Sequence, residues 1–129
     1  MLVNDREFES VIALPAPERY GHFIKRVADN QELWALRDAE GWLLLGDDEE
    51  NEAFPVWPAE RYAVAYGEAQ GMAEKPEAIE LSTWMEEMLP DLAANGVLIA
   101  VFPIPTGAAV TVTADDHAAH LELELEEYE

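Results

Sequence analysis

Cysteine is absent from the 129 residues of this chain. Disulfide bonds, a thiolate nucleophile and a zinc site with cysteine ligands are therefore excluded. A glycine-rich phosphate loop is also missing, because the seven glycines are dispersed along the sequence. Any chemistry must come from carboxylates, three histidines and a few hydroxyl groups.

Long apolar runs are missing as well. Residues 1–7 lack the basic and then apolar pattern of a secretory signal. No uninterrupted apolar run approaches the roughly 18 residues that a membrane-spanning helix needs. We therefore expect a cytoplasmic protein that does not associate with membranes.

Basic residues are scarce. Seven Lys and Arg residues stand against 28 Asp and Glu, the formal net charge is −21, and no Lys or Arg follows Lys75. A field of this sign repels phosphate backbones, so nucleic-acid binding is disfavoured. The charge would attract a basic protein, but solubility or adaptation to a salty cytoplasm is its simpler explanation.

The apolar content is sufficient for a core. Half of the residues are hydrophobic, and they include four Trp, four Tyr and four Phe. A chain of this length buries roughly two-thirds of its unfolded surface when it folds. We expect a single domain over residues 1–129, without internal repeats or a linker.

Helical patterns occur at five places. Asn4 with Glu7, and Thr113 with Asp116, form capping patterns at the start of two helices. Ser82 is interpreted as the cap of a helix that runs to about residue 95. Pro90 lies inside this helix and should kink or interrupt it. The C-terminal segment also alternates like a strand, but its cap and its Leu and Glu content favour a helix. The expected helices cover about residues 5–14, 17–29, 59–70 and 82–95, and the chain after Thr113.

Two apolar runs, 32–38 and 42–46, are separated by a turn containing Gly41 and predict a β-hairpin. Residues 54–58 contain Pro55 and Pro58, which predicts an edge strand or an extended entry into a helix. Residues 78–81 alternate briefly and suit a short strand.

The run Val97–Phe102 is the most hydrophobic in the chain and predicts a central strand covered on both faces. Residues 109–112 should be its hairpin partner, and the strand at 78–81 should lie parallel to it through a right-handed crossover. The expected fold is α+β, with a mixed sheet of four or five strands, a central strand near 97–102, and four or five packing helices.

His117, His120 and Glu124 are spaced to face one side of the C-terminal helix and could contact a divalent metal. Zinc needs three or four ligands, and no further histidine neighbours this pair in sequence. We therefore interpret both histidines as exposed residues of the helix and expect no metal site.

Asp47, Glu49 and Asn51 resemble the start of a calcium loop, but its sixth position holds Glu52 and its twelfth holds Pro58. We interpret this loop as solvated. No Gly-x-Ser-x-Gly elbow surrounds a serine, and carboxylates are too frequent to single out an acid–base pair. The sequence therefore predicts no catalytic residues, no cofactor and no enzymatic activity.

One segment has a composition that suits recognition. Aromatic residues beside charged ones are typical of interaction hot spots, although tryptophan in a short domain usually belongs to the core. The candidate partner- or ligand-binding residues are Trp42, Asp47, Asp48, Glu49, Glu50 and Trp57.

A set of short motifs resembles a bacterial family of short acidic proteins known as domain of unknown function 2750. The motifs are Leu33-Trp34-Ala35-Leu36, Gly41-Trp42, Phe54-Pro55-Val56-Trp57-Pro58 with Ala63, Leu89-Pro90, Gly96, Val101-Phe102-Pro103, and a Glu-rich last helix with Tyr128. The resemblance runs from Arg19 over nearly all of the remaining chain. It implies a single bacterial cytoplasmic domain and brings no activity or catalytic residue with it.

The order of the expected elements is also similar to the N-terminal domain of the enhanced-serine-sensitivity protein family. Relatives of that fold include immunity proteins of bacterial toxin systems, but a similar layout alone assigns no function. The sequence favours a non-enzymatic protein-interaction domain, for example an immunity or antitoxin-like inhibitor with a basic partner. The alternative is a small enzyme or ligand-binding domain with its site near the Trp42–Trp57 hairpin.

Overall fold

The computed structural model describes residues 3–46, 52–106 and 109–127. Its helices are α1 (Asp5–Ile12), α2 (Ala16–Asn30), α3 (Glu60–Ala69), α4 (Leu81–Thr83), the π-helical turn η1 (Trp84–Met88), α5 (Leu89–Ala94) and α6 (Ala114–Glu126). Its strands are β1 (Glu32–Asp38), β2 (Gly41–Trp42), β3 (Leu45–Gly46), β4 (Glu52–Val56), β5 (Lys75–Glu80), β6 (Leu98–Val101) and β7 (Val110–Val112). The α+β class is confirmed.

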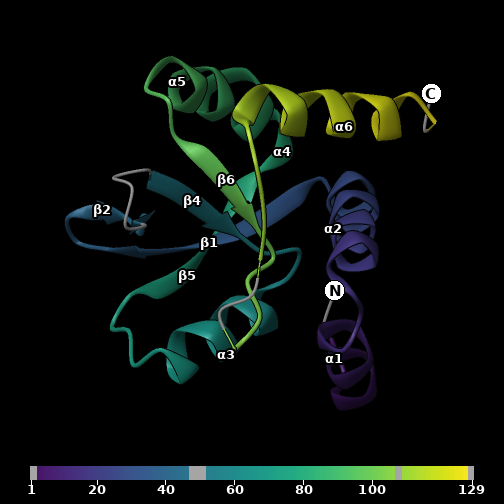
Figure 1. Cartoon of the computed structure of the whole chain (residues 1–129), viewed down its shortest axis with the longest axis vertical. Coiled ribbons are helices and arrows are strands. Elements are labelled where there is room, and N and C mark those ends of the chain that lie inside the picture. Colours follow the sequence, from purple (N-terminus) through teal and green to yellow (C-terminus); the bar gives the residue numbers. More distant parts are fainter. Residues whose placement is uncertain (1–2, 47–51, 107–108, 128–129) are drawn as a thin grey trace.

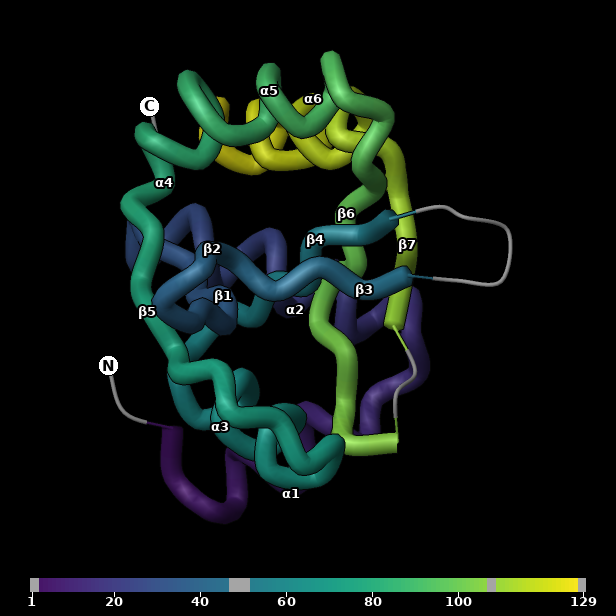
Figure 2. Tube along the Cα trace, turned by 90° about the vertical axis from the view of Figure 1, so that its left-hand side faces the viewer, coloured from purple at the N-terminus to yellow at the C-terminus, as the bar shows by residue number. Residues whose placement is uncertain are grey.

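The strands form two sheets, which Figures 1 and 2 show from perpendicular directions. The first sheet has the order β2-β1-β5 and is antiparallel throughout. The second has the order β3-β4-β6-β7 and is mixed, because β4 and β6 run parallel. The mixed four-stranded sheet with β6 inside it agrees with the prediction, and the three-stranded sheet adds to it.

The hairpin predicted around Gly41 is formed by β1 and β2. The Asp38 carboxylate accepts hydrogen bonds from the backbone N–H groups of Glu40 and Gly41, at 2.8 and 3.1 Å. Gly41 has a φ of 137°, which favours glycine. The rest of the predicted second strand leaves this hairpin, because Leu45 and Gly46 pair with β4 of the other sheet.

Of the two alternatives for the proline-containing segment, the edge strand was wrong, since β4 lies inside its sheet. Pro55 pairs with Ala100 of β6 on one side. On the other side β3 pairs only with Glu52 and Ala53, so no β3 residue lies opposite Pro55 and its missing N–H interrupts no ladder there.

The expected parallel crossover from the strand at 78–81 to Val97–Phe102 was also wrong. That strand is longer, spans Lys75–Glu80 as β5, and pairs antiparallel with β1 in the first sheet. The parallel neighbour of β6 is instead β4, an earlier strand that sequence order alone did not indicate.

The helix expected over 82–95 begins one residue earlier, so Ser82 is helical and does not cap it. Before Pro90 the helix widens into η1, where the Leu89 N–H donates to the carbonyl of Trp84. Proline cannot supply the usual i→i−4 bond, and a π-turn is one way for a helix to accommodate it. Gly96, at φ 70°, ends this helical stretch as predicted.

The two predicted capping residues are confirmed. The Asn4 side chain accepts from the Glu7 N–H at 2.8 Å, and the Thr113 hydroxyl accepts from the Asp116 N–H at 3.1 Å. The C-terminal segment is helical, as α6, which agrees with the prediction from its cap and composition.

The helices cover the sheets at two ends of the molecule. α5 and α6 lie side by side at one end, and α1 and α3 lie at the other (Figures 1 and 2). One core of buried side chains draws on both sheets and on every helix, including η1 and α5. Its members include Phe23, Leu33, Trp57, Trp84, Leu89, Ile99 and Leu121. Within the described residues, no helix is long and apolar enough to cross a membrane.

Candidate functional site

Trp57, one of the two tryptophans expected at a recognition site, belongs to the core. Its side chain is fully buried, and its indole Nε1–H donates to the Pro103 carbonyl at 2.7 Å. Its ring lies 5.4 Å from that of Tyr66. Trp57 therefore has no surface with which to contact a partner.

Trp42 is half-buried and faces a different environment. Its ring lies 5.9 Å from that of Phe54, and the Arg37 guanidinium lies 5.0 Å from the ring centroid. A hollow of about 210 Å³ lies beside it, lined also by Asp38, Glu40, Gly41, Leu43, Leu44 and Glu74. The structure thus does not bring Trp42 and Trp57 onto one surface, and Asp47, Asp48, Glu49 and Glu50 lie outside the described residues.

A larger hollow, of about 390 Å³, lies at the ends of β1 and β5. Arg37 and Lys75 are cross-strand partners there, and Arg37 contacts Glu77 at 3.1 Å. Both members of this ion pair are about half exposed. Exposed pairs of this kind contribute little to binding or stability.

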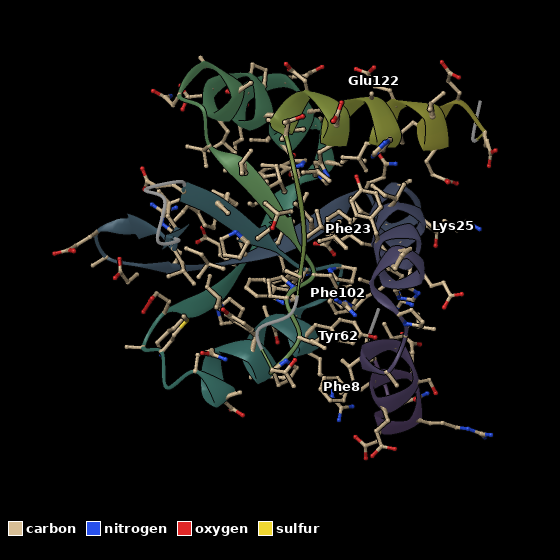
Figure 3. The ribbon with its side chains drawn as sticks, viewed as in Figure 1. Phe8, Phe23, Lys25, Tyr62, Phe102 and Glu122 are labelled. Atoms are coloured by element: carbon tan, nitrogen blue, oxygen red, sulfur yellow. The ribbon has the colours of Figure 1, made fainter. Side chains whose placement is uncertain are left out.

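One end of the molecule carries acidic side chains without basic ones. We call residues 81–94 and 114–126, which form α4, η1, α5 and α6, the acidic helical layer. Its acids are Glu86, Glu87, Asp91, Asp115, Asp116, Glu122, Glu124 and Glu126, and the sequence places no Lys or Arg in it. All of these acids except the half-buried Glu124 are exposed, and Glu122 points away from the body of the protein (Figure 3).

Leu123 lies among these acids on α6. Its side chain is 63% exposed, the highest value for a large apolar residue in the described part of the chain. An apolar residue surrounded by charges has the arrangement of an interface centre with a polar rim.

The interpretation of the two α6 histidines was half wrong. His120 is exposed, and its Nδ1 lies 2.6 Å from the Tyr20 hydroxyl. His117 is fully buried against the rings of Phe23 and Trp84, with centroids 5.6 and 5.9 Å away. Burial, aided by the neighbouring His120, lowers the pKa of His117 to about 3. Residues 3–46, 52–106 and 109–127 contain no group of three side chains that could hold a metal ion.

A polar cluster between α1, α2 and α3 was not predicted. It consists of Glu7, His22, Arg26 and Tyr62, and we call it the helix-junction cluster. Arg26 Nη1 lies 2.9 Å from Glu7 Oε2. Other buried atoms of this cluster, namely His22 Nε2, Arg26 Nε and Nη2, and the Tyr62 hydroxyl, have no hydrogen-bond partner among the described residues.

The pKa values of this cluster reflect its burial. Burial lowers the pKa of His22, and Arg26 lowers it further while Glu7 opposes the change. Burial and the Glu7 charge raise the pKa of Tyr62 to about 12. A buried polar atom left without any partner costs about 1–3 kcal/mol, so such groups in proteins are nearly always paired with protein or water. His22 and Arg26 share one face of a helix, but nothing in the sequence brings Tyr62 to them.

Searches of curated proteins and of solved structures gave no match. The sequence does match a family over residues 20–121, which is most of the chain and nearly the extent that the short motifs indicated. This match shows that the chain belongs to the family described as "Protein of unknown function (DUF2750)".

Proposed function

We propose that this chain is a non-enzymatic protein-interaction domain of the bacterial cytoplasm, which binds a basic partner through the acidic helical layer. An immunity or antitoxin-like inhibitor is one form that this function would take. The observation that carries the proposal is the unbalanced charge of the layer, which holds eight acids and no Lys or Arg.

Charge of one sign on one surface speeds the encounter with a partner of the opposite sign, and salt weakens this effect. Leu123 supports a more specific contact, because its exposed side chain would be buried by a bound partner. Both features lie on the same layer, whereas the ion pairs of the described residues (Arg26–Glu7, Arg37–Glu77 and Arg61–Asp5) lie elsewhere.

The test is capture of proteins from a bacterial lysate with two charge variants, followed by titration of each purified partner. The layer variant carries Glu86→Gln, Glu122→Gln and Glu126→Gln, three exposed positions. We expect it to lose a basic protein that the parent retains at physiological salt, and to bind that purified protein at least tenfold more weakly.

The matched control removes three exposed acids from the other end, with Glu9→Gln, Glu18→Gln and Glu60→Gln. Its net charge equals that of the layer variant, so binding driven by total charge would fall equally in both. Equal loss, or capture of no basic protein even at low salt, would contradict the proposal and leave salt adaptation as the explanation of the charge. Inhibition of a captured toxin would support the immunity form.

A further inference from the structure

The strand β5 forms an edge of the first sheet, because β1 pairs with it on one side only. Figure 2 shows β5 at the left margin of the molecule, with β1 and β2 on its inner side. Glu77, Ala78 and Glu80 are exposed, so another chain can reach this strand from solvent. An accessible edge of this kind presents backbone groups to which a further strand can be added.

The register of β5 shows which of its backbone groups face outward. Trp34 exchanges both of its backbone hydrogen bonds with Trp57, at 2.8 Å each, so its N–H and C=O face away from β5. Ala78 lies directly opposite Trp34, so its own N–H and C=O face away from β1. The same alternation directs the Glu80 N–H and the Pro76 C=O outward.

These outward groups have no partner within the part of the chain that the structure describes. No hydrogen bond there involves the N–H of Ala78 or of Glu80, and β5 pairs with no strand besides β1. Pro76 has no N–H to offer, so the edge presents two donors and, at Pro76 and Ala78, two acceptors. An antiparallel strand placed opposite residues 76–80 would pair with all four groups.

The side chains on this edge indicate the charge of such a strand. Glu80 lies directly opposite Glu32 of β1, in a pair whose backbone groups do not bond to each other. Side chains approach closely in pairs of this type, and like charges placed opposite each other destabilise a sheet. Neither Glu32 nor Glu80 takes part in the ion pairs of the described residues. A Lys or Arg opposite Glu80 would offset this repulsion.

The start of β5 is protected differently. Lys75 and Pro76 are residues that proteins use to block pairing at sheet edges, and they leave the stretch after Pro76 open. The hollow of about 390 Å³ lies here, lined by Lys75, Pro76 and Glu77 together with Arg37 and Asp38. A strand antiparallel to β5 would carry its C-terminal residues toward this hollow, which has space for a further side chain.

We propose that the outer edge of β5 binds an extended basic segment of a partner protein, which adds an antiparallel strand to the first sheet and places a Lys or Arg opposite Glu80. The backbone supplies the affinity and the glutamate pair selects the charge. The acids of this edge and the net charge of −21 oppose pairing with a second copy of the chain. The site is independent of the acidic helical layer, because a short segment could bind β5 even if the layer binds nothing.

The probe is a synthetic peptide with blocked ends and the core Arg-Val-Thr-Ile-Thr, designed to place its arginine opposite Glu80 and its last threonine opposite Pro76. We expect saturable binding to the full chain in calorimetric titration with peptide at up to about 1 mM. Methylation of the backbone nitrogen of the third residue removes the bond to the Ala78 carbonyl and should weaken binding at least tenfold. Methylation of the second residue, whose N–H faces away from β5, is the matched control and should change binding little.

A charge exchange tests the selection by Glu80. Glu80→Lys should weaken binding of this peptide roughly fivefold or more, since an attractive cross-strand pair becomes a repulsive one. A second peptide with glutamate in place of arginine should bind Glu80→Lys more tightly than it binds the parent, a gain that misfolding cannot produce. Glu18→Lys, at an exposed position of α2, changes the net charge equally and should bind both peptides almost as the parent does.

Absence of saturable binding to the parent would overturn the proposal. Equal binding of the two peptides to the parent, or binding that methylation of the third residue leaves unchanged, would overturn it too, because neither agrees with strand addition opposite Glu80. Sedimentation of the parent tests the other occupant. A dimer that the peptide dissociates would assign the edge to a second copy of the chain and overturn the proposal of a basic partner.

If Glu80→Lys does not fold, the two methylated peptides and the glutamate peptide decide with the parent chain alone.

Discussion

The two ends of the molecule use charge in opposite ways. At the end formed by α1 and α3, basic side chains connect elements. Arg61 contacts Asp5 and lies 4.6 Å from the Phe8 ring centroid, and Arg26 pairs with Glu7. In the acidic helical layer the sequence supplies no basic side chain, and the interior consists of rings and aliphatic groups such as Trp84, Phe54 and Leu121. Ion pairs therefore help to connect the first end, whereas the second is held mainly by burial, with a hydrogen bond between the Tyr20 hydroxyl and His120.

The largest expected difference in stability between the two ends comes from removing a buried ring of the acidic helical layer. The Trp84 side chain is fully buried, and its ring lies 5.3 Å from that of Phe54. Trp84→Ala should lower the free energy of unfolding by about 3–5 kcal/mol, measured by urea denaturation. Phe8→Ala, at the half-buried ring of the opposite end, should cost less than half as much; equal costs would contradict the comparison.

The second difference concerns pH. The folded state holds the pKa of His117 near 3, below its ordinary 6.5, so the unfolded state binds the proton first as pH falls. Stability from this residue is complete above about pH 6.5 and is lost progressively down to pH 3. Between pH 7 and pH 5 the loss is about 2 kcal/mol.

His117→Leu should flatten the pH dependence of unfolding by that amount, measured by denaturation at a series of pH values. His120→Gln, at the exposed neighbour, is the control and should change the slope little. An unchanged slope in His117→Leu would show that the carboxylates, and not this buried ring, set the acid sensitivity of the layer.

The third difference is smaller and tests the helix starts at the two ends. Thr113→Ala and Asn4→Ala each remove a side-chain acceptor from a helix N-terminus. Each should reduce the free energy of unfolding by about 1 kcal/mol. Thr113→Ser and Asn4→Asp retain the acceptor and should recover most of the loss, as thermal unfolding would reveal.

The smallest effect is repulsion within the layer. Glu122 and Glu126 lie four residues apart on α6, where like charges destabilise a helix by about 0.2–0.5 kcal/mol per pair. The Tm of the parent should rise with sodium chloride, and Glu122→Gln with Glu126→Gln should reduce that rise. Glu9→Gln with Glu18→Gln, at the opposite end, should reduce it less. The same reduction in both pairs would mean that total charge, and not its placement, sets the salt response.

Local signals in the sequence predicted most of the elements. Asn4, Thr113 and Gly96 act through side-chain or backbone geometry within a few residues, so their roles were visible without the fold. The apolar run at Val97–Phe102 likewise indicated a strand inside a sheet, because only burial on both faces explains such a run.

Predictions that depended on distant partners failed. The position of Pro55 depends on where β3 ends, and the parallel pairing of β6 depends on β4, so neither follows from local pattern. His117 looked exposed because its burial comes from α2 and η1, not from its own helix. The helix-junction cluster draws its members from three helices, which explains why no spacing in the sequence marked it.

The pairing of β4 with β6 also sets an order of events during synthesis. Residues 32–80 contain every strand of the first sheet. By contrast, β4 can pair with β6 only after the ribosome has added Ile99, the partner of Phe54. At about 5–20 residues per second, the ribosome needs roughly 2–9 s to supply it. During that interval the side of β4 that faces β6 has no partner, although Trp57 can already bond to Trp34 of β1. A nascent chain that stops before Val97 should therefore be retained by chaperones, while one that also includes α6, which supplies the buried Leu121, should be released.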